Sequence, residues 1–150
     1  MICQMEKSPT ERLILILEDN PDHASLITNA LTESSTQYRI VTIADGTKAM
    51  DFLHHRGEYT DAPRPDLILL DLHLPGKDGK EILTEIKADR QLHRIPIVVL
   101  TISQNEEDIF GIYALQGNSY VIKSDDLQQL TQTVKRIEEF WLRIVTLPLE

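Results

Sequence analysis

Five polar residues stand where short apolar runs of the chain end, and their types suit phosphate chemistry. Glu18 and Asp19 follow "LILIL", Asp71 follows "LILL", Thr101 ends "IVVLT", and Lys123 follows "YVI". Carboxylates brought together repel one another unless a cation lies among them, and oxygen ligands of this kind suit a hard divalent ion such as Mg²⁺. Mg²⁺ usually takes one or two carboxylates together with phosphate oxygens. The pattern predicts a magnesium-dependent phosphoryl site, if the fold brings these residues together.

Asp71 is the strongest candidate for the reacting group. It follows a continuous apolar run, Leu67 to Leu70, that indicates a strand buried on both faces, so its carboxylate would stand at the exposed end of that strand. An aspartate can act as a nucleophile and form an aspartyl phosphate, while a metal ion and a lysine neutralise the phosphoryl oxygens. We expect Lys123 and Thr101 to face those oxygens. Each residue alone has an ordinary structural explanation, and their recurrence at strand ends is what favours a site.

Five strand-like runs alternate with stretches of helical length. The strand-like runs are "RLILILED", "YRIVTIAD", "DLILLD", "IPIVVLT" and "SYVIKS". The helix-like stretches run from Pro21 to Glu33, Gly46 to Arg56, Lys80 to Arg90, Glu106 to Gln116 and Asp125 to about Ile144. The first, third and fourth runs are continuously apolar, which is typical of buried parallel strands. We therefore expect an α/β fold with an open parallel sheet, helices on both faces, and a ligand site outside the carboxyl ends of the strands.

The composition is that of one globular domain. The chain has 150 residues, of which 41% are hydrophobic and 26% charged, and we expect a flexible tail over residues 1–10 and a single domain over residues 11–150. The net charge of −9 argues against binding to nucleic acid or to an anionic membrane surface. The single cysteine, Cys3, excludes an internal disulfide, and no signal peptide or membrane-spanning run is evident. A cytoplasmic location follows as an expectation.

The chain resembles the receiver domain of two-component response regulators from about Arg12 to Glu139. The motifs that carry the resemblance are "LILILEDNPDH", "PDLILLDLHLPGKDG", "IVVLTIS" and "YVIKS". The resemblance implies a flavodoxin-like fold of five βα units, doubly wound, with strand order 2-1-3-4-5. It also implies that Asp71 accepts a phosphoryl group from a histidine kinase. Mg²⁺ would be held by Glu18, Asp19, Asp71 and the backbone carbonyl of His73.

By the same resemblance, Thr101 and Lys123 bind the phosphoryl group, and Tyr120 matches an aromatic switch position. Such a protein would be a signalling phosphoacceptor, and the only reactions it would catalyse are its own phosphotransfer and dephosphorylation. Three residues depart from the commonest receiver pattern, and the first is Glu18, which replaces the more frequent aspartate. Ser124 follows Lys123 where many receivers have proline, and Ile102 follows Thr101 where a small residue is common. These departures bear on the rates at which phosphate is gained and lost.

A narrower resemblance is to the single-domain response regulators that are paired with cyanobacterial phytochromes. The stretches "RIPIVVLT", "NEEDIFGIYAL" and "IEEFWLRIVTLPLE" carry it. It implies that the phosphodonor is a light-sensing histidine kinase. It also implies that the output is a contact with a downstream protein and not the action of an attached effector domain.

The last predicted helix carries an apolar stripe at helical spacing, which we expect to pack on the sheet. The stripe consists of Leu127, Leu130, Val134, Ile137, Trp141 and Ile144. Phe140 and Leu142 fall off the stripe on opposite sides. Apolar residues beside a core stripe near a chain end can form a partner surface, so we expect a homodimer with Phe140, Trp141 and Leu142 as interface candidates.

Other functional classes fit the residues less well. An aspartyl-phosphate phosphatase would need a second acid two residues after Asp71, where the chain has His73. A flavodoxin-like cofactor binder would need a glycine- and hydroxyl-rich loop after the first strand, where the chain has the acidic "EDNPDH". A receiver that no longer cycles phosphate, and acts only as a binding or dimerisation module, is a further alternative. The presence of Asp71, Thr101 and Lys123 argues against it.

Overall fold

The computed structural model describes residues 11–148, so the expected flexible tail over residues 1–10 lies outside the described part. The chain forms a five-stranded parallel sheet in the order β2-β1-β3-β4-β5. The strands are β1 (Arg12–Leu17), β2 (Tyr38–Ile43), β3 (Leu67–Leu70), β4 (Ile97–Thr101) and β5 (Ser119–Ile122). The flavodoxin-like order expected from the family resemblance is therefore confirmed.

Burial along each strand follows its place in the sheet. Every residue of β3 and β4 is buried, and so is all of β1 after Arg12. The edge strands β2 and β5 are mostly half-buried or exposed. The continuously apolar runs are thus the central strands, because a central parallel strand is covered by helices on both sides.

Each of the five described α-helices begins after an Asn or Asp whose side chain accepts backbone N–H groups of the first turn. The helices are α1 (Pro21–Thr32), α2 (Gly46–Leu53), α3 (Gly79–Ala88), α4 (Glu106–Ala114) and α5 (Leu127–Glu139), and their capping residues are Asn20, Asp45, Asp78, Asn105 and Asp126. The cap of α3 is reciprocal, since Glu81 also accepts a hydrogen bond from the N–H of Asp78, at 3.4 Å.

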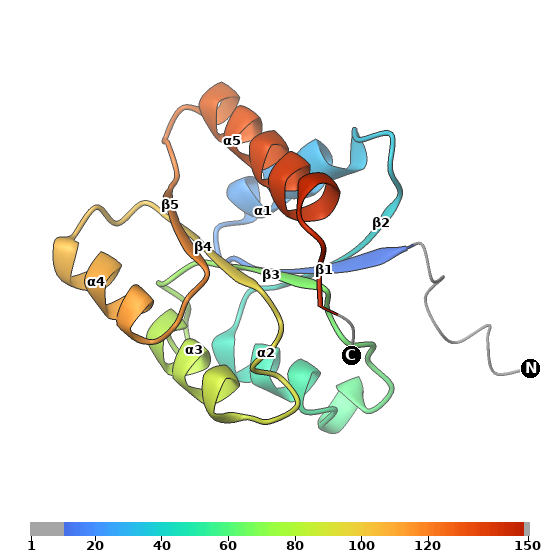
Figure 1. Cartoon of the computed structure of the whole chain (residues 1–150), viewed down its shortest axis with the longest axis vertical. Coiled ribbons are helices and arrows are strands. Elements are labelled where there is room, and N and C mark those ends of the chain that lie inside the picture. Colours follow the sequence, from blue (N-terminus) through green and yellow to red (C-terminus); the bar gives the residue numbers. More distant parts are fainter. Residues whose placement is uncertain (1–10, 149–150) are drawn as a thin grey trace, which may run out of the picture.

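The helices cover both faces of the sheet, as Figure 1 shows. Helices α1 and α5 pack on one face around Ile14, Ile16 and Leu69. Helices α2 and α3, together with Ile112 of α4, pack on the other face around Leu13, Leu15 and related residues. This arrangement leaves the two ends of the parallel strands uncovered by helices. None of the described helices is both long and apolar enough to cross a membrane.

Two predicted helix ends differ from the structure because a non-glycine residue adopts a left-handed conformation. Helix α2 ends at Leu53 instead of continuing to Arg56, since His55 has a φ of 58°. Helix α4 ends at Ala114 instead of continuing to Gln116, since Gln116 has a φ of 68°. Gly117 is needed for space, because a Cβ atom there would lie 2.5 Å from Cγ2 of Ile112.

The expected stripe of the last helix is only partly correct. Leu130, Val134 and Ile137 are buried, but Leu127 is 52% exposed and Ile144 is 65% exposed. Leu127 is the first residue of α5 and lies at the solvent-exposed start of the helix. Beyond Glu139 the chain forms a π-helical turn (Phe140–Ile144), closed by a hydrogen bond of 2.9 Å from Val145 N–H to the Phe140 carbonyl. This wider turn rotates Ile144 away from the core.

A buried acid holds the end of α5 against the edge strand β2. Glu138 Oε2 accepts hydrogen bonds from the Tyr38 hydroxyl at 2.7 Å and from Arg143 Nε at 2.8 Å. Arg143 also donates to the hydroxyls of Ser34 and Ser35. These contacts fix the segment after α5.

The central strand should be the most sensitive part of the core. We predict that Ile68→Ala lowers the free energy of unfolding by about 2–5 kcal/mol, because the fully buried side chain leaves a cavity between packed helices. Urea unfolding would measure this loss. Ile40→Ala, at a half-buried position on β2, is the matched control and should lose clearly less. Equal losses at both positions would contradict this view of the core.

Candidate functional site

Lys123 is buried between two carboxylates at the carboxyl edge of the sheet. Its Nζ lies 2.6 Å from Oε1 of Glu18 and 3.0 Å from Oδ2 of Asp71, and only 5% of the residue is exposed. The main chain sets this position, since the N–H of Lys123 donates to the Thr101 carbonyl at 2.8 Å. A buried ammonium group requires such partners, because its desolvation is otherwise unfavourable.

The carboxylate of Asp71 is fixed from several sides. Its backbone N–H donates to the Leu17 carbonyl at 3.0 Å, which anchors the end of β3 to β1. Its Oδ1 accepts hydrogen bonds from the His73 N–H at 3.0 Å and from the Thr101 hydroxyl at 3.1 Å. One oxygen therefore faces a hydroxyl and an amide, and the other faces an ammonium group.

Three carboxylates gather beside this lysine. Glu18, Asp19 and Asp71 each offer an oxygen atom, and these atoms lie within 4.8 Å of one another. Glu18 and Asp71 are buried, whereas Asp19 is exposed. The carboxylates open on a hollow of about 170 Å³ that His23, His73 and Ile102 also line. The donor set fits a hard divalent cation, which binds oxygen ligands and retains several waters.

The pKa values of the two buried acids move in opposite directions. Burial raises the pKa of Glu18 to about 7, with a further contribution from the charge on Asp71, and Lys123 offsets only part of this. Burial also acts to raise the pKa of Asp71, but the His73 N–H and Lys123 outweigh it, so the pKa lies below its ordinary value. A proton taken up by this pair near neutral pH therefore resides on Glu18.

The comparison with known families identifies the arrangement. A model of the response regulator receiver domain matches residues 14–135, a span that contains all five strands except the first residues of β1. The chain belongs to the response regulator receiver family. In this receiver domain, the residues described above lie at the carboxyl edge of the sheet.

The relatives and structures that match the receiver domain include phytochrome response regulators. This chain is 46% identical to response regulator Rcp1 of Synechocystis sp., over 95% of this chain and 97% of the relative. The structure of the phosphorylated cyanobacterial phytochrome response regulator RcpA is 53% identical, with a TM-score of 0.91, over 93% of this chain and 99% of that chain. The Mn²⁺-bound form of Rcp1 is 47% identical, with a TM-score of 0.89, over 92% and 99%.

The structure brings together the five residues that the sequence singled out. Glu18, Asp19, Asp71, Thr101 and Lys123 all stand at one edge of the receiver's sheet. They come from four different strand ends, and parallel strands carry such ends to the same edge.

The remaining predicted residues lie around this group. His73 is exposed, and its N–H contacts Asp71. Ile102 is exposed and lines the hollow. Tyr120 is half-buried, and its hydroxyl donates to the Ser103 carbonyl at 2.9 Å. Among the residues of 11–148, no peptide bond is cis, including the bond between Lys123 and Ser124.

A hydrogen-bonded chain beyond Tyr120 was not predicted from the sequence. The Ser103 hydroxyl donates to Asp108 at 2.7 Å, and Lys80 of α3 lies 2.7 Å from the other oxygen of Asp108. We call this set the α3–α4 bridge, because it joins α3 to the first turn of α4. Its only sequence signal is a serine and an acid at a spacing that is also typical of an ordinary helix start.

The raised pKa of Glu18 predicts how the metal-free stability depends on pH. The folded value of about 7 exceeds the ordinary 4.5, so the stabilising effect of protonation is fully present below pH 4.5 and is lost as the pH rises through about 7. We expect the metal-free domain to lose on the order of 1–3 kcal/mol of unfolding free energy over this range relative to Glu18→Gln. Urea unfolding in a chelator across this pH range measures the difference.

The comparison with Glu18→Gln isolates one group. His23 has a pKa lowered by burial and by Lys123, and it acts in the opposite direction, but it is present in both proteins. If the wild type and Glu18→Gln show the same dependence on pH, the buried carboxyl group is not the proton carrier.

Proposed function

We propose that the chain is a single-domain response regulator in which Asp71 accepts a phosphoryl group from a histidine kinase. The observation that carries this proposal is the setting of the Asp71 carboxylate. Thr101 Oγ1 lies 3.1 Å from one of its oxygens, and Lys123 Nζ lies 3.0 Å from the other. A hydroxyl and an ammonium group beside a carboxylate nucleophile can bind the oxygens of an incoming phosphoryl group.

The proposed reaction moves one group between two side chains. An oxygen of Asp71 forms a bond to phosphorus as the bond from phosphorus to the kinase histidine nitrogen breaks, and the histidine keeps that electron pair. Lys123 then pairs with the phosphoryl oxygens, and the Thr101 hydroxyl turns from the carboxylate to the same oxygens. Hydrolysis of the aspartyl phosphate by water returns the carboxylate and releases inorganic phosphate. The chain would catalyse only these steps on itself.

The proposal includes a Mg²⁺ ion held by Glu18, Asp19, Asp71 and the backbone carbonyl of His73. The carboxylate oxygens that lie within 4.8 Å of one another support this assignment, and so does the Mn²⁺-bound form of the relative Rcp1. The ion would neutralise negative charge on the transferring phosphoryl group. Glu18, whose Oε1 now pairs with Lys123, would turn toward the ion, which would leave the ammonium group free to pair with phosphate.

The phosphodonor is proposed to be a phytochrome histidine kinase in the cytoplasm. The support is the similarity to the cyanobacterial phytochrome response regulator RcpA over 93% of this chain. A downstream protein would read the phosphorylated state, and the face formed by α4, β5 and α5 suits this purpose. Phe110 is 76% exposed there, and Tyr113 and Ile122 are also exposed.

Thr101 and Tyr120 are proposed to transmit the change to this face. The Tyr120 hydroxyl holds the carbonyl of Ser103, two residues beyond Thr101. Movement of Thr101 toward a phosphoryl group would shift that carbonyl and release the tyrosine. The position of α4 would follow, because Ser103 also bonds to Asp108 at 2.7 Å.

Phosphorylation of Asp71 can be tested directly. We predict that incubation with a small acyl phosphate and Mg²⁺ adds one phosphoryl group to the wild type and none to Asp71→Asn, since the amide is not a nucleophile of this kind. Intact-mass spectrometry would detect the adduct. Asp61→Asn, at an exposed position remote from the site, is the matched control and should be phosphorylated like the wild type.

A chelator should abolish the adduct on the wild type. If neither the acyl phosphate nor a phytochrome kinase produces an adduct, the phosphoacceptor proposal is wrong, and a receiver that acts only as a binding module becomes the better description. An adduct that persists in Asp71→Asn would move the reaction to another residue.

We also propose a homodimer through the segment after α5. Phe140 is 48% exposed and contacts Trp141 edge to face, with ring centroids 5.5 Å apart. Trp141 and Leu142 are half-buried against the core beneath α5, so their contribution to an interface would be smaller than first expected. Phe140 is therefore the main candidate, and the exposed Ile144 lies beside it.

The proposed dimer predicts that a substitution in its interface lowers the molecular mass of the protein in solution. We expect Phe140→Glu to convert a dimer to a folded monomer, because a charge cannot be buried unpaired at an apolar contact. Size-exclusion chromatography with light scattering measures the mass, and circular dichroism checks the fold. Phe110→Glu on α4 is the matched control and should remain dimeric. A monomeric wild type, or a monomeric Phe110→Glu with a dimeric Phe140→Glu, contradicts the proposed interface.

A further inference from the structure

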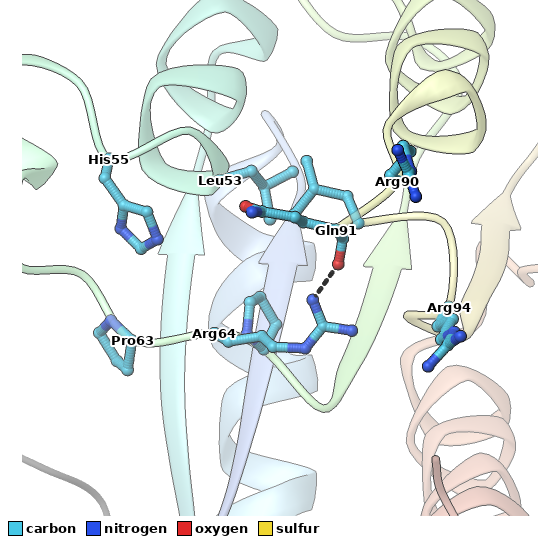
Figure 2. Close-up of a pocket in the computed structure, with 9 residues that line it drawn as sticks. Leu53, His55, Pro63, Arg64, Arg90, Gln91 and Arg94 are labelled. Atoms are coloured by element: carbon cyan, nitrogen blue, oxygen red, sulfur yellow. Dashed lines mark hydrogen bonds between the residues drawn. The ribbon is translucent and has the colours of Figure 1, made fainter. Parts of the chain in front are cut away.

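We propose that the receiver has a second ligand site, for a small organic anion, at the opposite end of the sheet from Asp71. A cavity of about 420 Å³ lies there between the end of α2, the segment before β3 and the segment before β4 (Figure 2). Pro63, Arg64 and Pro65 precede β3, and Arg90 and Arg94 precede β4. The cavity has the size of sites that hold small organic ligands.

The charge of the cavity is opposite to that of the molecule. The chain has 24 acidic and 15 basic residues, yet among residues 11–148 the cavity lining includes Arg64, Arg90 and Arg94 and contains no Asp or Glu. His55 adds a further potential hydrogen-bond donor at the rim, where Figure 2 shows it beside Pro63. Guanidinium groups bind phosphate and carboxylate with paired hydrogen bonds. The cavity therefore suits an anion.

Arg90 and Arg94 are available for such a ligand. Within residues 11–148 neither of them forms an ion pair, whereas Arg12, Arg56 and Arg143 are each paired with an acid. The neighbouring acid, Asp89, is engaged elsewhere. Its Oδ1 accepts the N–H groups of Gln91 and Leu92, and its Oδ2 lies 3.7 Å from Nδ1 of His54.

Arg64 forms part of the cavity wall and is held in place by a hydrogen bond. Its guanidinium group donates to the Gln91 carbonyl, the hydrogen bond drawn in Figure 2, and so ties the segment before β3 to the segment before β4. The cavity is thus built between two cross-linked segments, each of which leads into a central strand.

The rest of the lining determines the class of ligand. Leu53 and Leu92 are almost fully buried at the base, and Pro63 and Pro65 add apolar surface. Inorganic phosphate alone would leave this surface unused. A ring or short apolar body that carries a phosphate or a carboxylate would contact both the apolar base and the arginines.

The test uses three probes and the full-length wild-type protein. Phenyl phosphate, benzoate and inorganic phosphate are titrated into the ¹⁵N-labelled protein in a chelator, and amide shifts are followed by NMR. We expect shifts at Leu53, His55 and Leu92, with the ring-bearing anions binding more tightly than inorganic phosphate. Tighter binding of phenyl phosphate than of benzoate assigns a phosphate ligand, and the reverse order assigns a carboxylate.

Substitutions can distinguish a specific anion site in this cavity from non-specific electrostatic attraction to the protein. Arg90→Gln with Arg94→Gln should weaken binding of the preferred probe about tenfold or more, as expected for the loss of charge-assisted hydrogen bonds. Arg39→Gln with Arg136→Gln changes the net charge equally at two exposed positions outside the cavity and should leave the affinity unchanged. Equal weakening by both pairs, shifts confined to the Asp71 edge, or no shifts at millimolar probe would each overturn the proposal. Phosphorylation of Asp71 is measured separately, so either proposal can fail alone.

Discussion

The buried ion group of Lys123 with Glu18 and Asp71 is the interaction on which the functional end of the molecule depends. The ammonium group of Lys123 pairs with two carboxylates at a position from which water is largely excluded. Such a group is stable only while every member keeps a partner, because a buried charge left alone is strongly unfavourable. If a cation bound both acids, Lys123 would therefore need a new anionic partner.

The parallel sheet explains how residues that are distant in sequence meet at one edge of the molecule. Parallel strands present all their carboxyl ends at one edge, so residues as distant in sequence as Glu18 and Lys123 come within hydrogen-bond distance. The backbone contacts that hold those ends, such as Asp71 to Leu17 and Lys123 to Thr101, are part of the sheet or its direct extension. The central strands β1, β3 and β4 supply the stability of the core and position four of the five residues, and the edge strand β5 positions Lys123.

The meeting of these residues at one edge was predictable from the sequence because four of the five, Glu18, Asp19, Asp71 and Thr101, lie at the ends of buried strands, a pattern that depends only on local hydrophobicity. The features that were missed depend on contacts between elements. Leu127 and Ile144 fit a helical stripe, but their burial is decided by where α5 meets the sheet and by its π-helical turn. His55 and Gln116 adopt left-handed conformations that side-chain type does not signal. Arg90 and Arg94 acquire a cavity only when two separate segments meet.

The α3–α4 bridge has a consequence for the solution in which the protein works. Its outer link, Lys80 to Asp108, joins side chains that are 44% and 22% exposed, so dissolved ions can screen it. The hydrogen bond that continues from the bridge to Tyr120, between the tyrosine hydroxyl and the Ser103 carbonyl, joins uncharged groups and is not screened in this way. Ionic strength therefore acts on one end of the chain of contacts and not on the other. The stability of the contact between α3 and the first turn of α4 therefore depends partly on the salt concentration of the surrounding solution.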